Sequence, residues 1–349
     1  MEIFSLDLGN KQSKLKSSAG EKVLPSQILD AADLPQHVSS LSKESELHQF
    51  VVPFDERKWV WGESLSSLHL DDYLQDTLMY QNRYSTANYK LLANFALGLL
   101  ATDFPDSKEN VKDVVVVAGL PTEDYQNKTQ IESLNDVLRG QHQVEVDGQL
   151  YTIRVKKVYI VPQPVGTLYD QILDDKGFVQ NESLLSEKAA VVDVGGGTLL
   201  IDTLLNFNLD SRNRKQYDTG VNDLYQAVAS EMPGNVSLYR LEKALRLSNS
   251  NQKYAYAFSK NDIHDITTLV SKQIDRFTQR LVSNIQSTIK DFNSLDTLLI
   301  TGGGANLVNQ KILTTAFPNC LIVADPELAN VRGFYKYALS EESKVTDHE

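Results

Sequence analysis

Residues 189–203 read A-A-V-V-D-V-G-G-G-T-L-L-I-D-T. Four apolar residues lead to Asp193, three glycines follow at 195–197, and an apolar run resumes at Leu199. This pattern predicts two buried strands joined by a tight turn, with a carboxylate at the mouth of the turn. Glycine tolerates a positive φ and lets backbone N–H groups approach a ligand closely, so the turn is a candidate cradle for phosphate. A plain glycine hairpin, which needs no ligand, is the alternative.

Length and composition favour a soluble protein of two domains. The chain has 349 residues, of which 41% are hydrophobic and 23% charged, as is ordinary for globular proteins. Its net charge of −12 argues against direct binding to DNA or to an anionic membrane. The single cysteine, Cys320, excludes an internal disulfide framework and a cysteine-based zinc site. No signal peptide precedes Ile3 and no apolar run reaches membrane-spanning length, so we expect a cytoplasmic protein.

A second acidic turn stands near the start of the chain. Residues 3–10 read I-F-S-L-D-L-G-N, so a short apolar strand ends at Asp7 and is followed by Gly9 and Asn10. Lys14 and Leu15 then suggest the second strand of a hairpin. Asp7 and Asp193 lie roughly half a chain apart, and such a repeat indicates two domains of similar plan.

Periodicity and capping signals predict the remaining elements. Strands are expected at 50–52, 59–61, 114–117, 158–161 and from 298, and a polar hairpin over 143–151. Helices are expected after a cap at Ser85 or Thr86, up to Arg139, and over 221–232, 263–292, 308–316 and 329–339. The last ten residues are polar and are expected to form a frayed tail.

Five motifs in a fixed order carry a family resemblance. D-x-G at 7–9, D-x-G-G-G-T at 193–198 and T-G-G-G-A-N at 301–306 resemble the nucleotide-binding pattern of the actin, sugar-kinase and heat-shock-chaperone superfamily. V-P-Q-P-V-G-T-L-Y at 161–169 and D-P-E-L-A-N-V-R-G-F-Y-K-Y at 325–337 are similar to its two connecting helices. D-L-G-N, A-G-L-P at 118–121 and A-N-V-R-G at 329–333 resemble the plasmid-partition actins of the ParM/StbA group, especially those from plasmids of Gram-positive bacteria.

The resemblance implies an α/β, actin-like (ribonuclease H-like) fold of two duplicated domains with a nucleotide cleft between them. Domain I would comprise residues 1–165 and about 329–349, and domain II residues 166–328. The implied cofactors are ATP and Mg²⁺. GTP remains an alternative, because the contacts to the base are not identified.

The resemblance also implies roles for individual residues. Asp7 and Asp193 would hold Mg²⁺ through water, as hard oxygen ligands. Gln163 would orient the water that attacks the γ-phosphate, since a glutamine cannot take up the proton itself. The implied nucleotide-binding residues are Gly9, Asn10, Lys11, Lys14, Gly195, Gly196, Gly197, Thr198, Gly302, Gly303, Gly304 and Asn306. Lys11 is a departure, because it stands where many relatives have a second glycine.

The predicted roles of the other polar residues are less specific. One of Arg240, Glu242 and Lys243 is expected near the base or ribose, with no basis for a choice, and Asp202 is expected to support its hairpin. The histidines (His37, His48, His69, His142, His264 and His348) show no metal-ligand spacing. His142, which lies between two glutamines, is expected to be solvated in a loop.

The predicted function is that of an actin-like ATPase whose filaments move plasmid copies apart. Its partners would be further copies of itself and a DNA-binding adaptor on a centromere-like site, with no direct DNA binding and no membrane. The alternatives are a small-metabolite kinase of the same superfamily and a non-filamentous, nucleotide-switched scaffold or chaperone.

Overall fold

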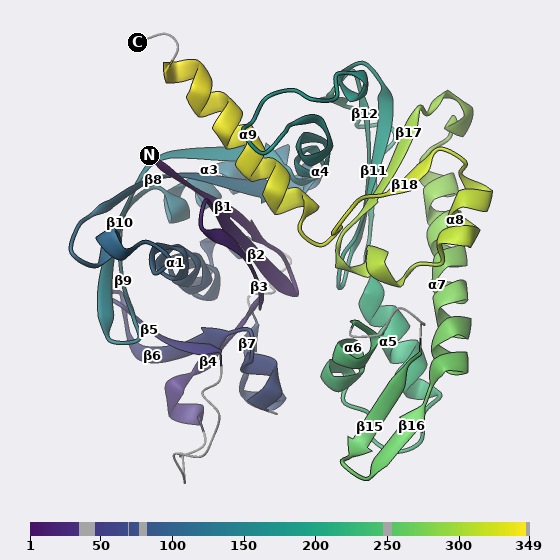
Figure 1. Cartoon of the computed structure of the whole chain (residues 1–349), viewed down its shortest axis with the longest axis horizontal. Coiled ribbons are helices and arrows are strands. Elements are labelled where there is room, and N and C mark those ends of the chain that lie inside the picture. Colours follow the sequence, from purple (N-terminus) through teal and green to yellow (C-terminus); the bar gives the residue numbers. More distant parts are fainter. Residues whose placement is uncertain (35–45, 69, 77–81, 247–252, 347–349) are drawn as a thin grey trace. The chain divides into compact units, whose positions relative to one another are not determined.

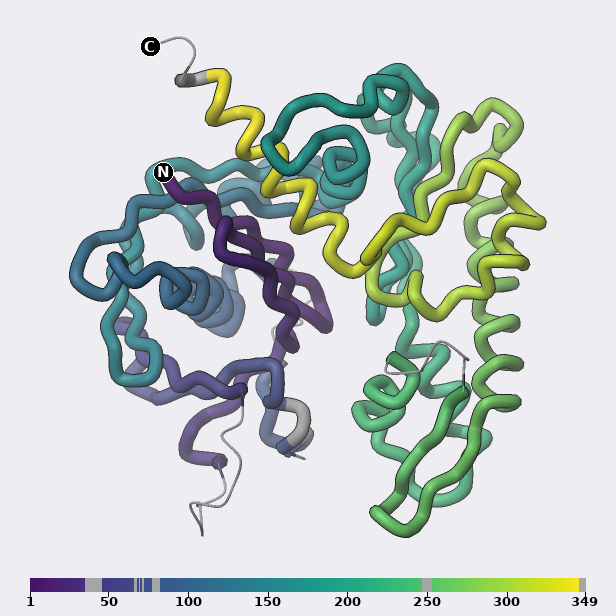
Figure 2. The backbone as a smooth tube through the Cα atoms, viewed as in Figure 1, coloured from purple at the N-terminus to yellow at the C-terminus, as the bar shows by residue number. Residues whose placement is uncertain are grey.

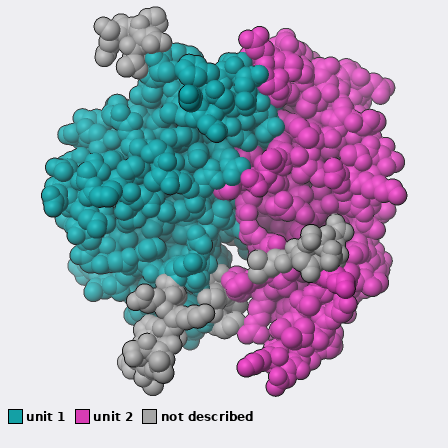
Figure 3. Space-filling view, viewed as in Figure 1, with its two compact units in different colours: residues 1–180, 330–349 teal, residues 181–329 magenta. Residues whose placement is uncertain are grey.

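The computed structural model describes residues 1–34, 46–68, 70–76, 82–246 and 253–346. The chain divides into two compact units (Figure 3). Unit 1 comprises Met1–Gln180 and Asn330–Glu349, and unit 2 comprises Asn181–Ala329. The sequence analysis predicts the two boundaries between the domains at 165/166 and 328/329. The difference at the first boundary arises because the helix that begins at Gln163 packs within unit 1.

Unit 1 is built on a ten-stranded mixed sheet with the order β3-β2-β1-β8-β10-β9-β5-β6-β4-β7. β1, β8 and β10 run parallel to one another, and the other pairs are antiparallel. The strands are β1 (Glu2–Leu8), β2 (Gln12–Ser17), β3 (Gly20–Pro25), β4 (Gln27–Asp30), β5 (Leu47–Val52), β6 (Asp55–Gly62), β7 (Gln75–Asp76), β8 (Lys112–Leu120), β9 (Gly140–Val146) and β10 (Gln149–Pro162). The helices are α1 (Ala87–Ala101), α2 (Thr122–Tyr125), α3 (Lys128–Leu138), α4 (Gln163–Ile172) and α9 (Ala329–Thr346).

The core of unit 1 forms where the sheet curls around α1 (Figure 1). α1 is apolar on nearly every side, and such a helix has to be surrounded by other elements. Thr86 caps it by accepting from the N–H of Tyr89 at 3.2 Å, as expected. The valines 114–117 of β8 are fully buried, which confirms a strand covered on both faces.

The C-terminal helix α9 covers the other face of this sheet. Its yellow trace passes beside the purple N-terminal strands (Figure 2), where the Ser5 hydroxyl donates to the carbonyl of Val331 at 2.7 Å. The prediction of a frayed tail from residue 340 is wrong, because α9 continues to Thr346. Glu342 anchors this last part by accepting from Lys157 Nζ at 3.1 Å and from the Tyr159 hydroxyl at 2.9 Å.

Unit 2 is built on a smaller sheet with the order β13-β12-β11-β17-β18, with β14 also paired to β12. β11, β17 and β18 are parallel. The strands are β11 (Lys188–Val194), β12 (Leu199–Leu205), β13 (Asn208–Leu209), β14 (Lys215–Tyr217), β15 (Ala255–Ser259), β16 (Asp262–Asp265), β17 (Thr297–Thr301) and β18 (Cys320–Ile322). The helices are α5 (Val221–Ser230), α6 (Leu238–Arg246), α7 (Thr267–Thr288) and α8 (Gln310–Ala316).

The long helix of unit 2 begins later than its apolar periodicity indicates. α7 starts at Thr267, whereas Ile263 lies exposed on β16, paired with Ala257 of β15. Ile263 happens to extend the helical spacing, but it belongs to a separate two-stranded hairpin. The prediction of a helix over 263–292 is therefore wrong by four residues at each end, because α7 ends at Thr288.

The prediction for His142 is also wrong. His142 lies on β9 and is buried, with Nδ1 2.9 Å from Asn94 Oδ1 and Nε2 2.9 Å from the carbonyl of Leu138. The two neighbouring glutamines are exposed, because strand alternation turns them to the face opposite His142. His37, His69 and His348 lie outside the described residues.

Candidate functional site

The acidic turn of unit 1 follows the first central strand. β1 and β2 form an antiparallel hairpin in which Asp7 is paired with Lys14. Asp7 is buried, and Lys14 Nζ lies 3.6 Å from its Oδ2. A buried carboxylate is costly without a compensating charge, and Lys14 supplies that charge.

The chain between these two residues is held closely. The Ser26 hydroxyl donates to the carbonyl of Gly9 at 2.6 Å, and the Ser26 N–H donates to the carbonyl of Lys11 at 2.9 Å. A Cβ at Gly9 would lie 2.8 Å from the carbonyl oxygen of Gln12, so this turn requires glycine. The side chain of Lys11 is exposed. The turn thus forms with Lys11, rather than a second glycine, at this position.

Arg83 reaches this turn from a distant part of the sequence. Its Nη1 donates to Asn10 Oδ1 at 2.6 Å, and its Nη2 donates to the carbonyl of Leu8. Arg83 begins the short 3₁₀ helix η4 (Arg83–Ser85), directly before α1. Sequence reasoning missed this residue, because no motif or spacing links position 83 to positions 8 and 10.

Gln163 lies at the same edge of the sheet as Asp7. β1, β8 and β10 are parallel neighbours, so their carboxyl ends share one edge. Asp7 is near the end of β1, and Gln163 directly follows β10 as the first residue of α4. Pro164 is at the second helical position, where the missing N–H costs no hydrogen bond. The carboxyl edge of parallel strands is the usual place for a ligand in α/β proteins.

The acidic turn of unit 2 repeats this plan. Asp193 is buried near the end of β11, whose parallel neighbour β17 pairs Thr301 with it. The hairpin to β12 closes with a hydrogen bond from the N–H of Gly195 to the carbonyl of Thr198 at 2.9 Å. A Cβ at Gly197 would meet no other atom within 4 Å, so the tip of this turn is open.

The start of α5 supports this turn from behind. The N–H groups of Val221 and Asn222 donate to the carbonyls of Gly195 and Gly196 at 3.0 and 2.9 Å. Gly220 is required there, because a Cβ would lie 2.5 Å from the carbonyl oxygen of Gly196. These two helix N–H groups are used within the protein. They fix the glycine turn in place.

The third glycine turn lies directly against Asp193. Gly302 has φ of +86°, and a Cβ there would come within 2.3 Å of Asp193 Oδ1. Its N–H donates to the carbonyl of Pro326 at 2.9 Å. Residues 303–307 form the 3₁₀ helix η8 (Gly303–Leu307), in which Gly304 packs on Val194 while Asn306 is exposed.

Three of the weaker candidates of unit 2, Asp202, Arg240 and Glu242, have structural partners. Arg214 Nε donates to Asp202 Oδ1 at 3.3 Å, and Asp202 is almost fully buried in the hairpin. Arg240, Glu242 and Lys243 lie on α6, where Glu242 pairs with Arg246 at 3.4 Å and Arg240 Nη1 donates to the carbonyl of Phe258 at 3.4 Å. The geometry of unit 2 alone does not select one of the three.

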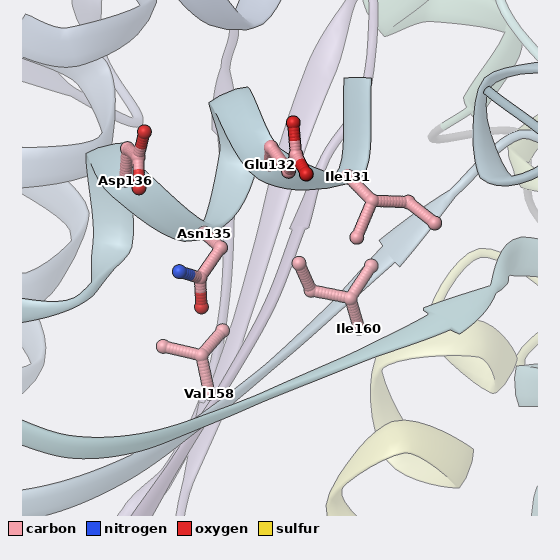
Figure 4. A pocket seen from close by; sticks show the side chains of 6 residues that line it. All are labelled: Ile131, Glu132, Asn135, Asp136, Val158 and Ile160. Atoms are coloured by element: carbon pink, nitrogen blue, oxygen red, sulfur yellow. The ribbon is translucent and has the colours of Figure 1, made fainter. Parts of the chain in front are cut away.

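A groove in unit 1 is separate from these residues. It lies between α3 and β10 and is lined by Ile131, Glu132, Asn135, Asp136, Val158 and Ile160 (Figure 4). None of the predicted site residues lines it. In the described part of the chain, no three His, Cys, Asp or Glu side chains cluster as a metal site.

The described helices also include none with the length and apolar character needed to cross a bilayer.

The residues of both acidic turns suit a nucleotide with Mg²⁺. Each turn has one buried carboxylate, and carboxylate oxygens are the donors that Mg²⁺ prefers, often through retained water. Each carboxylate borders a glycine turn that a Cβ would obstruct, at Gly9 or at Gly302. Lys14 adds a cation at the first turn, where a phosphate would need one.

Two family models match the chain. The model for the N-terminal domain of actin like proteins matches residues 5–166, and that for the C-terminal domain of the archaeal MreB-like actin homologue matches residues 191–314. The chain is an actin-like protein. All three glycine turns lie within the two matched segments. No curated protein matches the sequence.

Solved structures agree with this assignment of the actin-like fold. The apo pSK41 ParM protein is 26% identical to the chain, with a TM-score of 0.77 over 100% of this chain and 99% of that one. The archaeal actin homologue Ta0583 in complex with ADP is 17% identical, with a TM-score of 0.73 over 97% and 99%. A 15-stranded ParM filament from Clostridium botulinum is 20% identical, with a TM-score of 0.73 over 96% and 98%. The last two, at their low identity, establish a shared fold alone.

Proposed function

We propose that this actin-like chain binds Mg-ATP through the acidic turns of both units, assembles into filaments and hydrolyses ATP. The observation that carries the proposal is the repeated arrangement of Asp7 and Asp193. Each is a buried carboxylate near the end of a central parallel strand, and each borders a glycine turn. Each turn offers a carboxylate beside backbone amides, which are the groups that a phosphate chain and its cation require.

In this proposal each residue of the turns has one task. Asp7 and Asp193 hold the waters of Mg²⁺, and Lys14 offsets phosphate charge. The backbone amides of Gly9, Gly195, Gly196 and Gly197, with Asn10 and Thr198, donate to phosphate oxygens. Lys11 adds a second cation from its exposed position. Gly302, Gly303, Gly304 and Asn306 approach the nucleoside, and bound Mg²⁺ supplies the positive charge that stabilises phosphoryl transfer.

Gln163 is proposed to orient the attacking water. It stands at the first position of α4, on the sheet edge that also carries Asp7. A glutamine amide can accept and donate hydrogen bonds but cannot take up a proton at neutral pH. Hydrolysis that depends on positioning alone is slow, and slow hydrolysis suits a filament that must persist before it disassembles.

The biological role is proposed from the relatives. The pSK41 protein is a ParM, the Ta0583 protein is in complex with ADP, and the Clostridium botulinum ParM is a filament. We infer that this chain acts in the cytoplasm and moves plasmid copies apart. DNA would be held by an adaptor protein on a centromere-like site. GTP is the alternative nucleotide.

Sedimentation with nucleotide tests the proposal. At tens of micromolar protein, Mg-ATP should drive the chain into the pellet and release phosphate, whereas ADP should leave it in the supernatant. Asp193→Ala should weaken Mg-ATP binding by about a hundredfold, because a metal-binding carboxylate is lost. Asp136→Ala, on the exposed face of α3, is the matched control and should assemble normally.

Two results would contradict different parts of the proposal. Binding and hydrolysis without any sedimentation would exclude filaments and leave the ATPase. Unchanged Mg-ATP affinity in Asp193→Ala would exclude the metal assignment.

A further inference from the structure

Arg83 joins two parts of unit 1 that are far apart in sequence. Its guanidinium donates to Asn10 Oδ1 at 2.6 Å and to the carbonyl of Leu8. Its own carbonyl accepts from the N–H and the hydroxyl of Thr86 at 3.1 and 2.8 Å, and Thr86 caps α1. Arg83 therefore ties the turn after β1, through its side chain, to the residues that begin the buried central helix, through its backbone carbonyl.

This contact decides which way the Asn10 amide points. An arginine only donates hydrogen bonds, so the atom that faces it must be the Asn10 oxygen. The two N–H donors of Nδ2 are then directed elsewhere. A rotated amide would instead turn its oxygen away from Arg83, and an acceptor in that position would repel a phosphate oxygen. Arg83 thus determines the orientation of the Asn10 side-chain amide.

The guanidinium is itself held in place by two buried rings. It lies 5.6 Å from the ring centroid of Tyr84 and 5.2 Å from that of Tyr89, at distances suited to cation–π attraction. The Tyr84 hydroxyl donates to Asp124 Oδ2 at 2.7 Å, which fixes that ring. Burial raises the pKa of Tyr89 to about 12, and the Arg83 charge opposes this rise. Both rings therefore stay neutral and pack against a permanent cation.

We propose that Arg83 is a positioning residue for the phosphate-binding turn, holding Asn10 with its amide N–H groups directed to a bound phosphate. The inference rests on the proposed nucleotide binding and adds to it a residue that does not touch the nucleotide. A lysine cannot replace Arg83 fully, because its single ammonium lacks the planar fork that serves two acceptors.

A double-mutant cycle on Mg-ATP affinity tests the inference. The dissociation constant is measured with a fluorescent ATP analogue for the wild type, Arg83→Ala, Asn10→Ala and the double variant. Each single change should weaken Mg-ATP binding about tenfold. The double variant should bind Mg-ATP as tightly as the single variant with the lower affinity, because both changes act through one amide. Arg83→Lys should lie between Arg83→Ala and the wild type.

The control is Arg57→Ala. Like Arg83, Arg57 donates a hydrogen bond through its guanidinium, here to Asp55 Oδ2 at 2.7 Å, and lies over an aromatic ring, that of Trp59 at 4.3 Å. None of these contacts involves the turn after β1. This variant should bind Mg-ATP as the wild type does. If Arg83→Ala does not fold, Arg83→Lys replaces it in the cycle.

The outcomes separate the two proposals. The role of Arg83 would be overturned if the double variant lost affinity by the product of the two single losses, or if Arg83→Ala bound Mg-ATP as the wild type does. Either result would leave the proposed nucleotide binding intact. A wild-type protein that binds no Mg-ATP would overturn the proposed function, and the inference with it.

Discussion

At the residue scale, Asp7 and Lys14 explain how an acidic turn is stable before any ligand binds. A carboxylate in this buried position loses its hydration, and Lys14 at 3.6 Å restores part of the lost electrostatic stabilisation. The pair also restrains the Asp7 carboxylate, so a cation would meet a preformed oxygen donor.

Gln163→Ala should separate hydrolysis from binding. We expect phosphate release to slow by about tenfold to a hundredfold, since a water that is not oriented rarely attacks in line. Mg-ATP affinity should change little, and filaments should persist longer in light scattering. Gln171→Ala, from the same helix, is the matched control. Unaltered phosphate release in Gln163→Ala would remove this residue from the reaction.

His142 makes stability depend on pH. Burial lowers the pKa of His142 below its ordinary 6.5, and its contact with the Leu138 carbonyl opposes this only in part. The unfolded chain therefore takes up the proton first as the pH falls. Neutral His142 contributes its full stabilisation when the pH is above the pKa of histidine in the unfolded chain. That stabilisation is lost as the pH falls from there toward the lower pKa of His142 in the folded protein.

The expected loss is at most about 1.4 kcal/mol per pH unit below roughly pH 6.5, measured by denaturant unfolding at a series of pH values. His142→Gln should show a shallower decline than the wild type. His264→Gln removes an exposed imidazole and is the control. Equal slopes in the wild type and His142→Gln would show that another group carries the pH dependence.

At the element scale, α4 and α9 cross within unit 1 so closely that a Cβ atom has no room at the glycines of the crossing. A Cβ at Gly333 would lie 1.7 Å from the carbonyl oxygen of Gly166. A Cβ at Gly166 would lie 2.4 Å from the ring of Phe334. The contact is extended by a hydrogen bond from Thr167 to Asn330 at 2.7 Å and by Lys336 with Asp170 at 2.9 Å. This crossing is why α4 belongs to unit 1.

Gly333→Ala should therefore destabilise unit 1 strongly. The added methyl group meets backbone, which cannot move aside as a flexible side chain would. We expect a loss of about 3 kcal/mol, equivalent to a melting temperature lower by roughly 6–12 °C. Lys344→Ala, at an exposed position of the same helix, should leave the melting temperature nearly unchanged. A Gly333→Ala variant that melts with the wild type would contradict the close crossing.

At the scale of the whole molecule, the net charge of −12 sets how the chain meets DNA. DNA binding without sequence preference requires basic side chains that displace counterions from phosphates. We expect no shift of duplex DNA in electrophoresis at tens of micromolar protein and about 0.15 M salt. The same assay with ATP-assembled filaments checks whether assembly creates a basic surface. A shift by the protein alone would contradict the need for an adaptor.

The sequence by itself determined the three glycine turns, the order of the motifs and most helices and strands. These features depend on local properties, namely the φ that glycine allows, the caps at helix ends and the period of apolar residues. The same local signals identified the actin-like pattern.

Only the tertiary structure decided which distant residues support those turns. It brought Arg83 to Asn10, used the first N–H groups of α5 on Gly195 and Gly196, and buried His142 against Asn94. Each contact joins segments that no local rule relates, because its position depends on how whole strands and helices pack. The acidic turns were therefore readable from the sequence, whereas the residues that hold them in place were not.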